Sequence, residues 1–325
     1  MRRRAHAPLL KSAILSGEAN DVPYKNTAIG GNVSHDGEQE LRMMYDVAVL
    51  GGGTMGVGIA YVAAQAGGRV FVVEPDVSRV GAIERAIEGA LASAIKRGKM
   101  DDAQGRALAA RITRVASVEV LPEGLDLIVE SVPEQLEIKL DVLARAAARK
   151  PRLIATNTSA LSIDRLAVAV ADPAMFLGMH FFNPVWSIRL VEIVQGAQTS
   201  GVALDMARAM SAWMGKESLT VRDVPGFATS RLDFAASLEA MRMLESGVAT
   251  AEDIDRAAVV AYRHPVGPLR LSDIVGLDVR LSVARTLEAA HGSRFAPPAI
   301  LETMVRDGKL GAKSGQGFFA WPASN

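Results

Sequence analysis

Between about residues 45 and 156, short apolar runs rich in β-branched side chains alternate with longer amphipathic stretches. Such runs are typical of buried strands. They predict five strands, over 45–50, 69–74, 112–115, 125–130 and 153–156. Helical periodicity lies between them, over 77–98, over 101–111 and in a helix that we expect to begin at Pro133. This alternation predicts a parallel sheet that is covered by helices on both faces.

The pattern changes after residue 175. Two strands are predicted over 175–182 and 189–194, and a third over 219–222. After Pro225 and Gly226 the strand pattern stops, and four helices are predicted over 227–245, 251–261, 271–290 and 298–306. We therefore predict an α/β protein with a Rossmann-type doubly wound sheet, followed by an all-helical C-terminal domain. The predicted domains are 44–222 and 223–325.

Residues 1–43 do not share this pattern. They combine three arginines at positions 2–4 with little hydrophobic periodicity and a turn-rich segment over 20–37. An Arg-rich opening suggests an organelle transit peptide, but the acidic residues that follow are unusual in such a signal. We interpret this segment as a disordered tail or as an extension from a start codon assigned upstream of Met43 or Met44.

Composition narrows the class of protein. With 325 residues, 49% hydrophobic, the chain is long enough for two domains with separate cores. Its 36 basic and 36 acidic residues balance, which gives no reason to expect nucleic acid or an anionic membrane as a partner. Cysteine is absent, and the five histidines are scattered without ligand spacing, so we predict no disulfide and no metal site.

The strand over 45–50 leads into a glycine-rich turn that opens a helix. Gly51, Gly53 and Gly56 fit the spacing that lets the backbone approach a pyrophosphate at a helix N-terminus. Free N–H groups and the positive end of the helix dipole favour an anion there. We expect Thr54 and Met55, in the same loop, to contact the bound dinucleotide as well.

The second strand ends in an acid, Glu74, eighteen residues after Gly56. A carboxylate at this strand tip accepts hydrogen bonds from the adenosine ribose and repels the additional phosphate of NADP. Glu74 therefore indicates NAD as the cofactor. The ordinary alternative is that Glu74 ends its strand at the surface, which fits the surrounding pattern less well.

His180 and Glu192 lie on two successive predicted strands joined by a short connection. An ionised Glu192 among apolar neighbours would be costly without a partner. A carboxylate on one imidazole nitrogen fixes the tautomer and leaves the other nitrogen free as a general base. The alternative is a core histidine bonded to a backbone carbonyl, with Glu192 facing solvent. The residues themselves leave both interpretations open.

Three further polar residues have ordinary explanations when each is taken alone. Ser159 follows a strand at the edge where ligands of α/β sheets collect, but it is also a typical turn residue. Asn183 precedes Pro184 and is more often a turn former than a ligand, and Lys313 lies in a glycine-rich loop where a solvated charge is expected.

From about Met44 to Trp321 the chain resembles the short-chain L-3-hydroxyacyl-CoA dehydrogenase family, which includes the bacterial 3-hydroxybutyryl-CoA dehydrogenases. Each motif is weak alone, but together they agree in order and spacing. They are the glycine loop at 51–58, Glu-Ser-Val-Pro-Glu at 130–134, Asn-Thr-Ser at 157–159, His-Phe-Phe-Asn-Pro at 180–184, Leu-Val-Glu at 190–192, Pro-Gly-Phe at 225–227, His-Pro-Val-Gly-Pro at 264–268 and Lys-Ser-Gly-Gln-Gly-Phe at 313–318.

The resemblance implies roles for individual residues. It implies that His180 is the catalytic base, that Glu192 orients it, and that Ser159 and Asn183 lie beside the substrate and the nicotinamide. Positions that contact NAD in relatives are matched by three residues, Glu134, Lys139 and Lys313.

Two substrate positions depart from the family pattern. Ser230 stands where the family usually has an asparagine that helps to hold the substrate, so substrate orientation or choice is expected to differ. The positions that contact coenzyme A in relatives through a serine and a lysine match Ala90 and Arg97. Arg97 keeps the positive charge, whereas Ala90 has no group that forms a hydrogen bond.

The resemblance implies reversible NAD-dependent oxidation of an (S)-3-hydroxyacyl-CoA thioester, with 3-hydroxybutyryl-CoA favoured, by a cytoplasmic homodimer of fatty acid β-oxidation. The helical domain would bind substrate and pair the subunits. One alternative is a gulonate or carnitine dehydrogenase, although those families tend to have proline after the histidine, where this chain has Phe181. Another is a non-catalytic NAD-binding protein related to crystallins, which the presence of both His180 and Glu192 disfavours.

Overall fold

The computed structural model of the protein describes residues 44–322, so the predictions for residues 1–43 lie outside the described part of the chain. Within that part, eight strands form one sheet in the order β3-β2-β1-β4-β5-β6-β7-β8. The strands are β1 Asp46–Leu50, β2 Arg69–Val73, β3 Ile112–Val115, β4 Leu127–Glu130, β5 Ile154–Thr156, β6 Phe176–Phe181, β7 Leu190–Gln195 and β8 Glu217–Arg222.

All neighbouring strands run parallel except β6 and β7, which are antiparallel. The chain reverses its direction of winding at β1, which pairs with β2 on one side and with β4 on the other. Ligands of doubly wound sheets bind at such a switch point, outside the carboxyl ends of the strands. The loops after β1 and β4 therefore define the expected binding edge.

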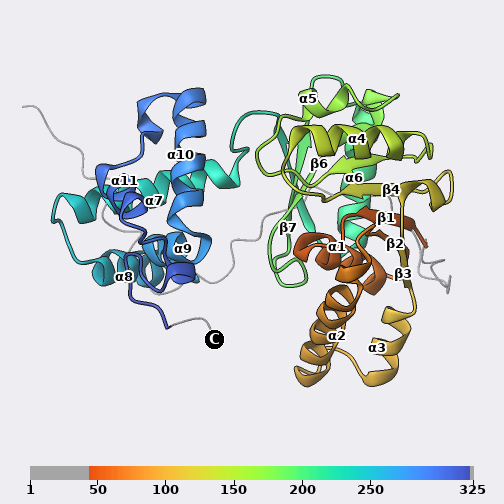
Figure 1. The fold of residues 1–325 in the computed structure, drawn as a ribbon, viewed down its shortest axis with the longest axis horizontal. Helices are drawn as coiled ribbons and strands as arrows, with labels where there is room; N and C mark the ends of the chain where they lie inside the picture. The colour runs from red at the N-terminus through yellow and green to blue at the C-terminus, as the bar shows by residue number, and fades with distance from the viewer. Residues whose placement is uncertain (1–43, 323–325) are drawn as a thin grey trace, which may run out of the picture. The chain divides into compact units, whose positions relative to one another are not determined.

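Helices cover both faces of the sheet (Figure 1). Residues of α1 Thr54–Gln65, α2 Val80–Lys96, α3 Asp102–Ala109 and α6 Gly201–Trp213 pack against one face, and residues of α4 Leu136–Ala147 and α5 Ile163–Ala167 pack against the other. Along β1, Val47 and Val49 join one apolar cluster while Ala48 and Leu50 join another. Both faces of the strand are buried, which explains its continuous apolar run. The predicted fold class is confirmed.

The sequence analysis missed two helices of the sheet domain, α5 and α6. The larger, α6, connects β7 to β8, which is why these two strands run parallel. Ser200 caps it, since its side chain accepts a hydrogen bond from the N–H of Ala203. The buried positions Ala203, Leu204, Ala207 and Met210 have helical spacing, and that spacing was the available signal.

Two predicted helix boundaries were wrong. α4 begins at Leu136 instead of Pro133, because Glu134 turns its carboxylate to backbone N–H groups that follow β5. The helix predicted over 271–290 is two helices, α9 Pro268–Val275 and α10 Leu277–His291. They are separated at Gly276, whose φ of +105° is left-handed and ends an α-helix.

The C-terminal helices surround an apolar cluster of their own, which includes Leu238, Met241, Leu269 and Leu287. Besides α9 and α10, they are α7 Thr229–Glu245, α8 Ala251–Tyr262 and α11 Ala299–Arg306.

The glycine-rich motif at 313–318 has a structural partner in this domain. The fully buried Asp273 of α9 accepts hydrogen bonds from the backbone N–H groups of Phe318 and Phe319 and from the indole N–H of Trp321. A Cβ added to Gly317 would lie 2.1 Å from Oδ1 of Asp273. The motif therefore lets the last described segment approach a buried carboxylate.

Candidate active site

A cavity of about 690 Å³ opens at the carboxyl ends of the central strands, at the predicted switch point. Seven of the residues predicted from the sequence line it: Gly51, Gly53, Thr54, Met55, Glu74, Glu134 and Ser159. Residues that were not predicted also line it, among them Arg79 and Asn157. This volume is within the usual range for small-molecule and cofactor sites.

The glycine loop has the close packing that its spacing predicts. Gly51 has a φ of +109°, and a Cβ added to it would lie 2.6 Å from the carbonyl oxygen of Ser131. A Cβ at Gly56 would lie 1.9 Å from the carbonyl oxygen of Gly51. At Gly53 the nearest such contact is 3.8 Å away, and no described side chain caps α1 there. The first N–H groups of α1 are thus available to an anion such as a pyrophosphate.

Gly56→Ala is expected to weaken NADH binding by about tenfold or more, because relieving a contact this short costs roughly 1–3 kcal/mol of local rearrangement. Fluorescence titration with NADH measures the effect. The matched control is Gly89→Ala in α2, where an added Cβ meets no atom within 4 Å and alanine favours the helix. Equal NADH affinity of wild type and Gly56→Ala would show that the loop is not built as described.

Glu74 lies immediately after β2, and its carboxylate is held in place. Oε2 accepts a hydrogen bond of 3.2 Å from the N–H of Gly52 and pairs with Arg79 at 3.3 Å, while Oε1 accepts one from the N–H of Asp76. Glu74 is only 4% exposed, so the alternative in which it ends its strand at the surface was wrong. Arg79, the cation closest to Glu74 in these contacts, has its charge paired by this carboxylate.

His180 and Glu192 are direct partners across the antiparallel strands β6 and β7. Nδ1 of His180 lies 2.8 Å from Oε2 of Glu192, and Nε2 lies 3.0 Å from Oγ of Ser159. His180 is 6% exposed and Glu192 is fully buried. The alternative in which Glu192 faces solvent was wrong. Opposite positions on one sheet face have neighbouring Cβ atoms, so the register itself brings the pair together.

The N-terminus of α7 supplies further hydrogen-bond donors to Glu192. The sequence analysis missed these contacts. Oε1 accepts hydrogen bonds from the N–H groups of Ala228 and Thr229, and Oε2 accepts one of 2.7 Å from the Thr229 hydroxyl. Burial acts to raise the pKa of Glu192, but the hydrogen bonds from His180 and Thr229 outweigh it and hold the pKa below its ordinary value. The carboxylate therefore stays ionised beside the imidazole.

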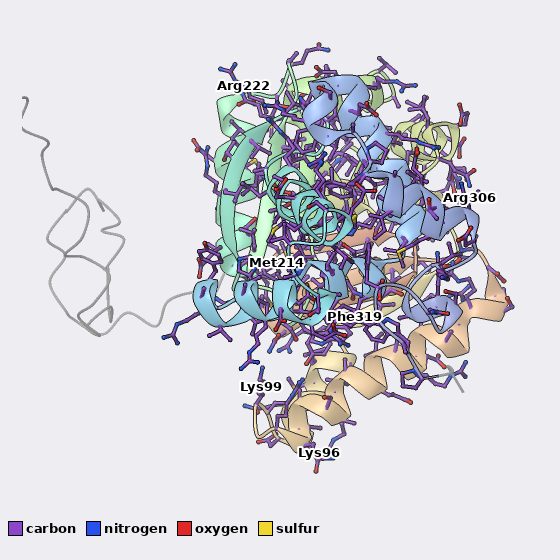
Figure 2. All side chains as sticks on the ribbon, turned by 90° about the vertical axis from the view of Figure 1, so that its left-hand side faces the viewer. Lys96, Lys99, Met214, Arg222, Arg306 and Phe319 are labelled. Atoms are coloured by element: carbon purple, nitrogen blue, oxygen red, sulfur yellow. The ribbon has the colours of Figure 1, made fainter. Side chains whose placement is uncertain are left out.

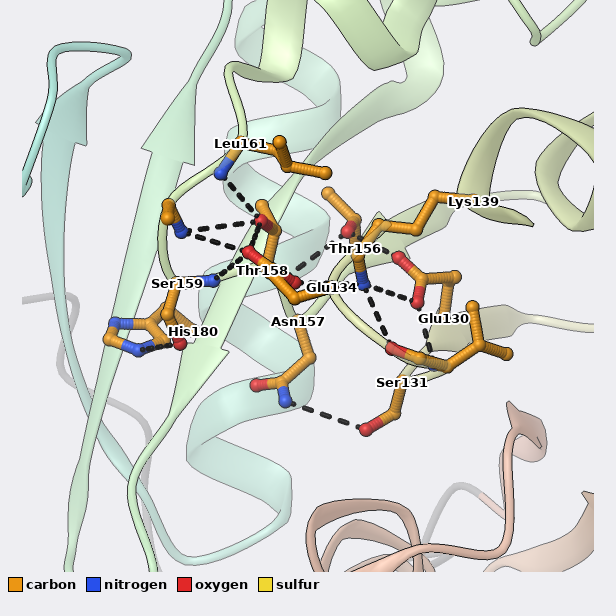
Figure 3. A network of polar contacts seen from close by, with 12 residues as sticks. Glu130, Ser131, Glu134, Lys139, Thr156, Asn157, Thr158, Ser159, Leu161 and His180 are labelled. Carbon is orange, nitrogen blue, oxygen red and sulfur yellow. Dashed lines mark hydrogen bonds and ion pairs between the residues drawn. The ribbon is translucent and has the colours of Figure 1, made fainter. Parts of the chain in front are cut away.

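A second polar network joins the ends of β4 and β5 (Figure 3). Oε1 of Glu134 accepts hydrogen bonds from the N–H groups of Ser159 and Ala160 and from the Thr158 hydroxyl. Burial acts to raise the pKa of Glu134, but the Thr158 hydroxyl and the charge of Lys139 outweigh it, and the pKa is lowered. This carboxylate fixes the backbone that carries Ser159.

Lys139, for which the resemblance implied a cofactor contact, is not among the residues that line the cavity. It is 1% exposed, and Nζ lies 2.6 Å from Glu130, 3.2 Å from Glu134 and 3.2 Å from the carbonyl oxygen of Val132. A lysine ammonium has three N–H donors, and these three acceptors occupy all of them. Lys139 therefore holds Glu134 in place from the buried side of its carboxylate. Glu130, its fully buried partner, was a motif residue without an assigned role.

Other predicted residues lie outside the cavity lining. Lys313 pairs with Asp278 at 2.5 Å in the helical domain. Arg97 is exposed where α2 ends, the same end at which Figure 2 shows Lys96 and Lys99 projecting into solvent. Ser230 is half-buried in the first turn of α7, and Asn183 is exposed in the loop after β6.

Lys216 was also missed, and it fixes the loop that contains Asn183. Its buried ammonium donates hydrogen bonds to the carbonyl oxygens of Val185 and Ile188. Burial lowers its pKa. Val185 in turn packs on α1, where a Cβ added to Gly58 would lie 2.7 Å from its side chain. The loop beside His180 is thereby connected to α1, the helix that follows the glycine loop.

Among residues 44–322, no helix is both long enough and apolar enough to cross a bilayer. No group of three or more histidine, aspartate or glutamate residues is arranged there to hold a metal ion.

Comparison with known proteins identifies matches along nearly the whole described chain. A family model described as 3-hydroxyacyl-CoA dehydrogenase, NAD binding domain, matches residues 46–224. A second model, 3-hydroxyacyl-CoA dehydrogenase, C-terminal domain, matches residues 226–321.

Individual relatives agree with these models. A 3-hydroxybutyryl-CoA dehydrogenase of Mycobacterium tuberculosis is 36% identical over 280 residues, which cover 85% of this chain and 98% of the relative. A 3-hydroxyadipyl-CoA dehydrogenase of Escherichia coli is also 36% identical, over 85% of this chain and 59% of its own length. The crystal structure of (S)-3-hydroxybutyryl-CoA dehydrogenase from Ralstonia eutropha is similar with a TM-score of 0.82 and 33% identity, covering 86% of this chain and 100% of that one.

Proposed function

Because this chain belongs to the 3-hydroxyacyl-CoA dehydrogenase family and is an NAD-dependent enzyme, we propose that it interconverts (S)-3-hydroxyacyl-CoA and 3-ketoacyl-CoA with His180 and Glu192 as its base pair. One observation carries this proposal. The buried carboxylate lies 2.8 Å from Nδ1, and Nε2 faces the Ser159 hydroxyl at the edge of the sheet where ligands collect. We favour 3-hydroxybutyryl-CoA, the substrate in the names of several relatives.

The residues around the cavity fit NAD. The backbone at Gly51, Gly53 and Gly56, with Thr54 and Met55, would hold the pyrophosphate at the start of α1. Glu74 would accept hydrogen bonds from the adenosine ribose. When bound, NAD supplies the hydride acceptor of the reaction. Glu134 and Ser159 line the part of the cavity nearest His180 and would lie beside the nicotinamide.

In the oxidation, Nε2 of His180 accepts the proton of the 3-hydroxyl group while C3 loses a hydride. Glu192 accepts a hydrogen bond from Nδ1–H of His180. This bond keeps Nε2 unprotonated before the reaction and stabilises the imidazolium that forms. The Ser159 hydroxyl, 3.0 Å from Nε2, positions the substrate oxygen. In the reverse direction His180 returns the proton to the ketone oxygen.

Further residues would orient the thioester. We propose that Asn183 contacts the substrate from the loop that Lys216 fixes. Ser230 presents a hydroxyl in place of the family amide, and Arg97 would meet a phosphate of coenzyme A.

We also retain the predicted division into an NAD-binding domain over 44–222 and a substrate and dimerisation domain over 223–325, and the predicted cytoplasmic role in β-oxidation.

The direct test mixes the protein with acetoacetyl-CoA and NADH and follows the loss of NADH absorbance. We expect turnover with the thioester and little with free acetoacetate. Turnover of free hydroxy acids in preference to CoA thioesters would favour the gulonate or carnitine type. NADH binding without turnover of any 3-ketoacyl-CoA would contradict the proposal.

We further propose a homodimer that forms through the helical domain. Helix α9 packs against both α8 and α10. Six large apolar side chains on these three helices are between 39% and 76% exposed: Val259, Val260, Tyr262, Ile274, Val275 and Val279. An apolar surface of this extent marks an association site, and self-association around a twofold axis is the commonest arrangement. Light scattering should give twice the mass of the chain for wild type, and a lower mass for Val260→Glu.

A further inference from the structure

The network after β4 and β5 carries an excess of negative charge. Glu130 and Lys139 form a pair that is removed from solvent, with exposures of 0% and 1%. Glu130 also accepts hydrogen bonds from the N–H of Val132 and from the Thr156 hydroxyl, so its oxygens are fully engaged. Lys139 also pairs with Glu134 at 3.2 Å, so one ammonium is shared by two carboxylates and the three groups together keep a net negative charge.

Glu134 is the member of this network that meets the cavity. Its side chain is 39% exposed, and it belongs to the cavity lining. Figure 3 shows its carboxylate next to Ser159. The carboxylate accepts a hydrogen bond of 3.1 Å from the N–H of Ser159, and the hydroxyl of Ser159 in turn contacts His180. Because hydride transfer has to occur next to the catalytic base, the nicotinamide end of the cofactor belongs here.

Two other carboxylates line the cavity, Asp141 and Glu74. Asp141 of α4 pairs at 3.3 Å with Arg145, which also pairs with Glu119 after β3. Glu74 lies at the opposite end of the cavity from Glu134. Glu74 follows β2, whereas Ser159 and its bond to Glu134 follow β5, and β1 and β4 lie between these strands. Three strand spacings of about 4.8 Å separate the two positions. Of the three carboxylates that line the cavity, only Glu134 accepts a hydrogen bond from the backbone of Ser159, beside the position proposed for the reacting ring.

The oxidised nicotinamide ring carries a positive charge and the reduced ring does not. The remainder of the cofactor has the same charge in both states. A carboxylate near the ring consequently binds the oxidised form more tightly, whereas a carboxylate near the adenosine affects both forms alike. The lowered pKa of Glu134 keeps its carboxylate charged at neutral pH.

We propose that Glu134 stabilises bound NAD⁺ relative to bound NADH and so lowers the reduction potential of the cofactor on the enzyme. The inference rests on the proposed function, because it takes the nicotinamide to lie beside Ser159 and His180. Its consequence is that bound NADH is a stronger reductant than free NADH. The equilibrium between enzyme-bound reactants then moves toward the 3-hydroxyacyl thioester, as a hydride passes to C3 and His180 gives its proton to the oxygen.

The test is the ratio of the two dissociation constants, Kd(NAD⁺)/Kd(NADH), measured by calorimetry without any acyl-CoA. Glu134→Gln should raise this ratio by about tenfold, because a neutral amide does not attract a cation that lies within a few ångströms in a partly buried site, whereas a carboxylate does. A tenfold change in the ratio raises the potential of the bound two-electron couple by about 30 mV.

Two matched variants make the result specific. Glu74→Gln is the same substitution in the same cavity, and it should weaken both forms equally and leave the ratio unchanged. Glu134→Asp keeps the charge and should retain a ratio close to that of wild type, which separates charge from loss of folding. The proposal is overturned by an unchanged ratio in Glu134→Gln, or by an equal rise in Glu74→Gln. Failure of turnover in the acetoacetyl-CoA assay would leave this binding ratio measurable, so the two proposals fail separately.

Discussion

Replacing His180 by glutamine should lower kcat for acetoacetyl-CoA reduction by about 10²–10⁴, the usual contribution of a positioned general acid or base. Glutamine has a similar length and still forms hydrogen bonds, but it cannot take up or release a proton at neutral pH. NADH affinity should stay unchanged, because His180 is not among the residues that line the cavity in which we propose that the cofactor binds. Steady-state kinetics and fluorescence titration measure the two quantities.

His264→Gln is the control for this substitution. His264 is exposed in the helical domain, after the end of α8, so its replacement should leave kcat unchanged. If His180→Gln retained the wild-type kcat, the assignment of the base would be wrong. If it lost NADH binding as well, its effect would be structural instead of catalytic.

Glu192→Gln should also reduce kcat strongly, by about 10²–10⁴, while KM for acetoacetyl-CoA changes little. The amide keeps the size of the side chain, and its oxygen can still accept from the N–H groups of Ala228 and Thr229. Its NH₂ group, however, can donate to Nδ1 of His180, which favours the tautomer that carries its proton on Nε2. A carboxylate-to-amide change at the corresponding position of a serine-protease triad has an effect of about 10⁴ for this reason.

A matched control for Glu192 lies on the neighbouring strand. Glu217 of β8 is exposed and pairs with Arg189, so Glu217→Gln should leave both kcat and the melting temperature near those of wild type. Comparison of melting temperatures shows whether Glu192→Gln remains folded. A folded Glu192→Gln variant with wild-type kcat would remove Glu192 from the proposed mechanism.

Much of the fold could be predicted because its signals are local. Each parallel strand is a continuous apolar run, since side chains on both of its faces are buried, as Val47 and Ala48 illustrate. The glycine loop could be predicted for a similar reason, because the contact between Gly51 and Gly56 involves residues five positions apart. The helix α6 was missed although the helical spacing of its buried residues was an available signal. The break at Gly276 shows the limit of such signals, since a single glycine is tolerated within helical patterns.

In the candidate site, too, the residues could be named from the sequence, but their contacts depend on the tertiary structure. The residues alone left two interpretations open for His180 and Glu192, and the register of β6 and β7, which makes them direct partners, decides between the two. The contact of Thr229 with Glu192 could not be predicted either, since it depends on where α7 begins relative to the sheet. Lys139 illustrates the same limit, because a lysine that follows a glutamate-rich turn gives no sign of whether it faces a cofactor or a buried carboxylate.

The sequence by itself determined most of the strand and helix pattern and the closely packed glycine turn at the start of α1. These follow from contacts between near neighbours in the chain and from the apolar period of each element. Only the tertiary structure decided that Lys139 lies between Glu130 and Glu134, and that the start of α7 holds Glu192. Such contacts join residues whose separation in space is set by how the sheet and the helices pack, and no local pattern records that packing.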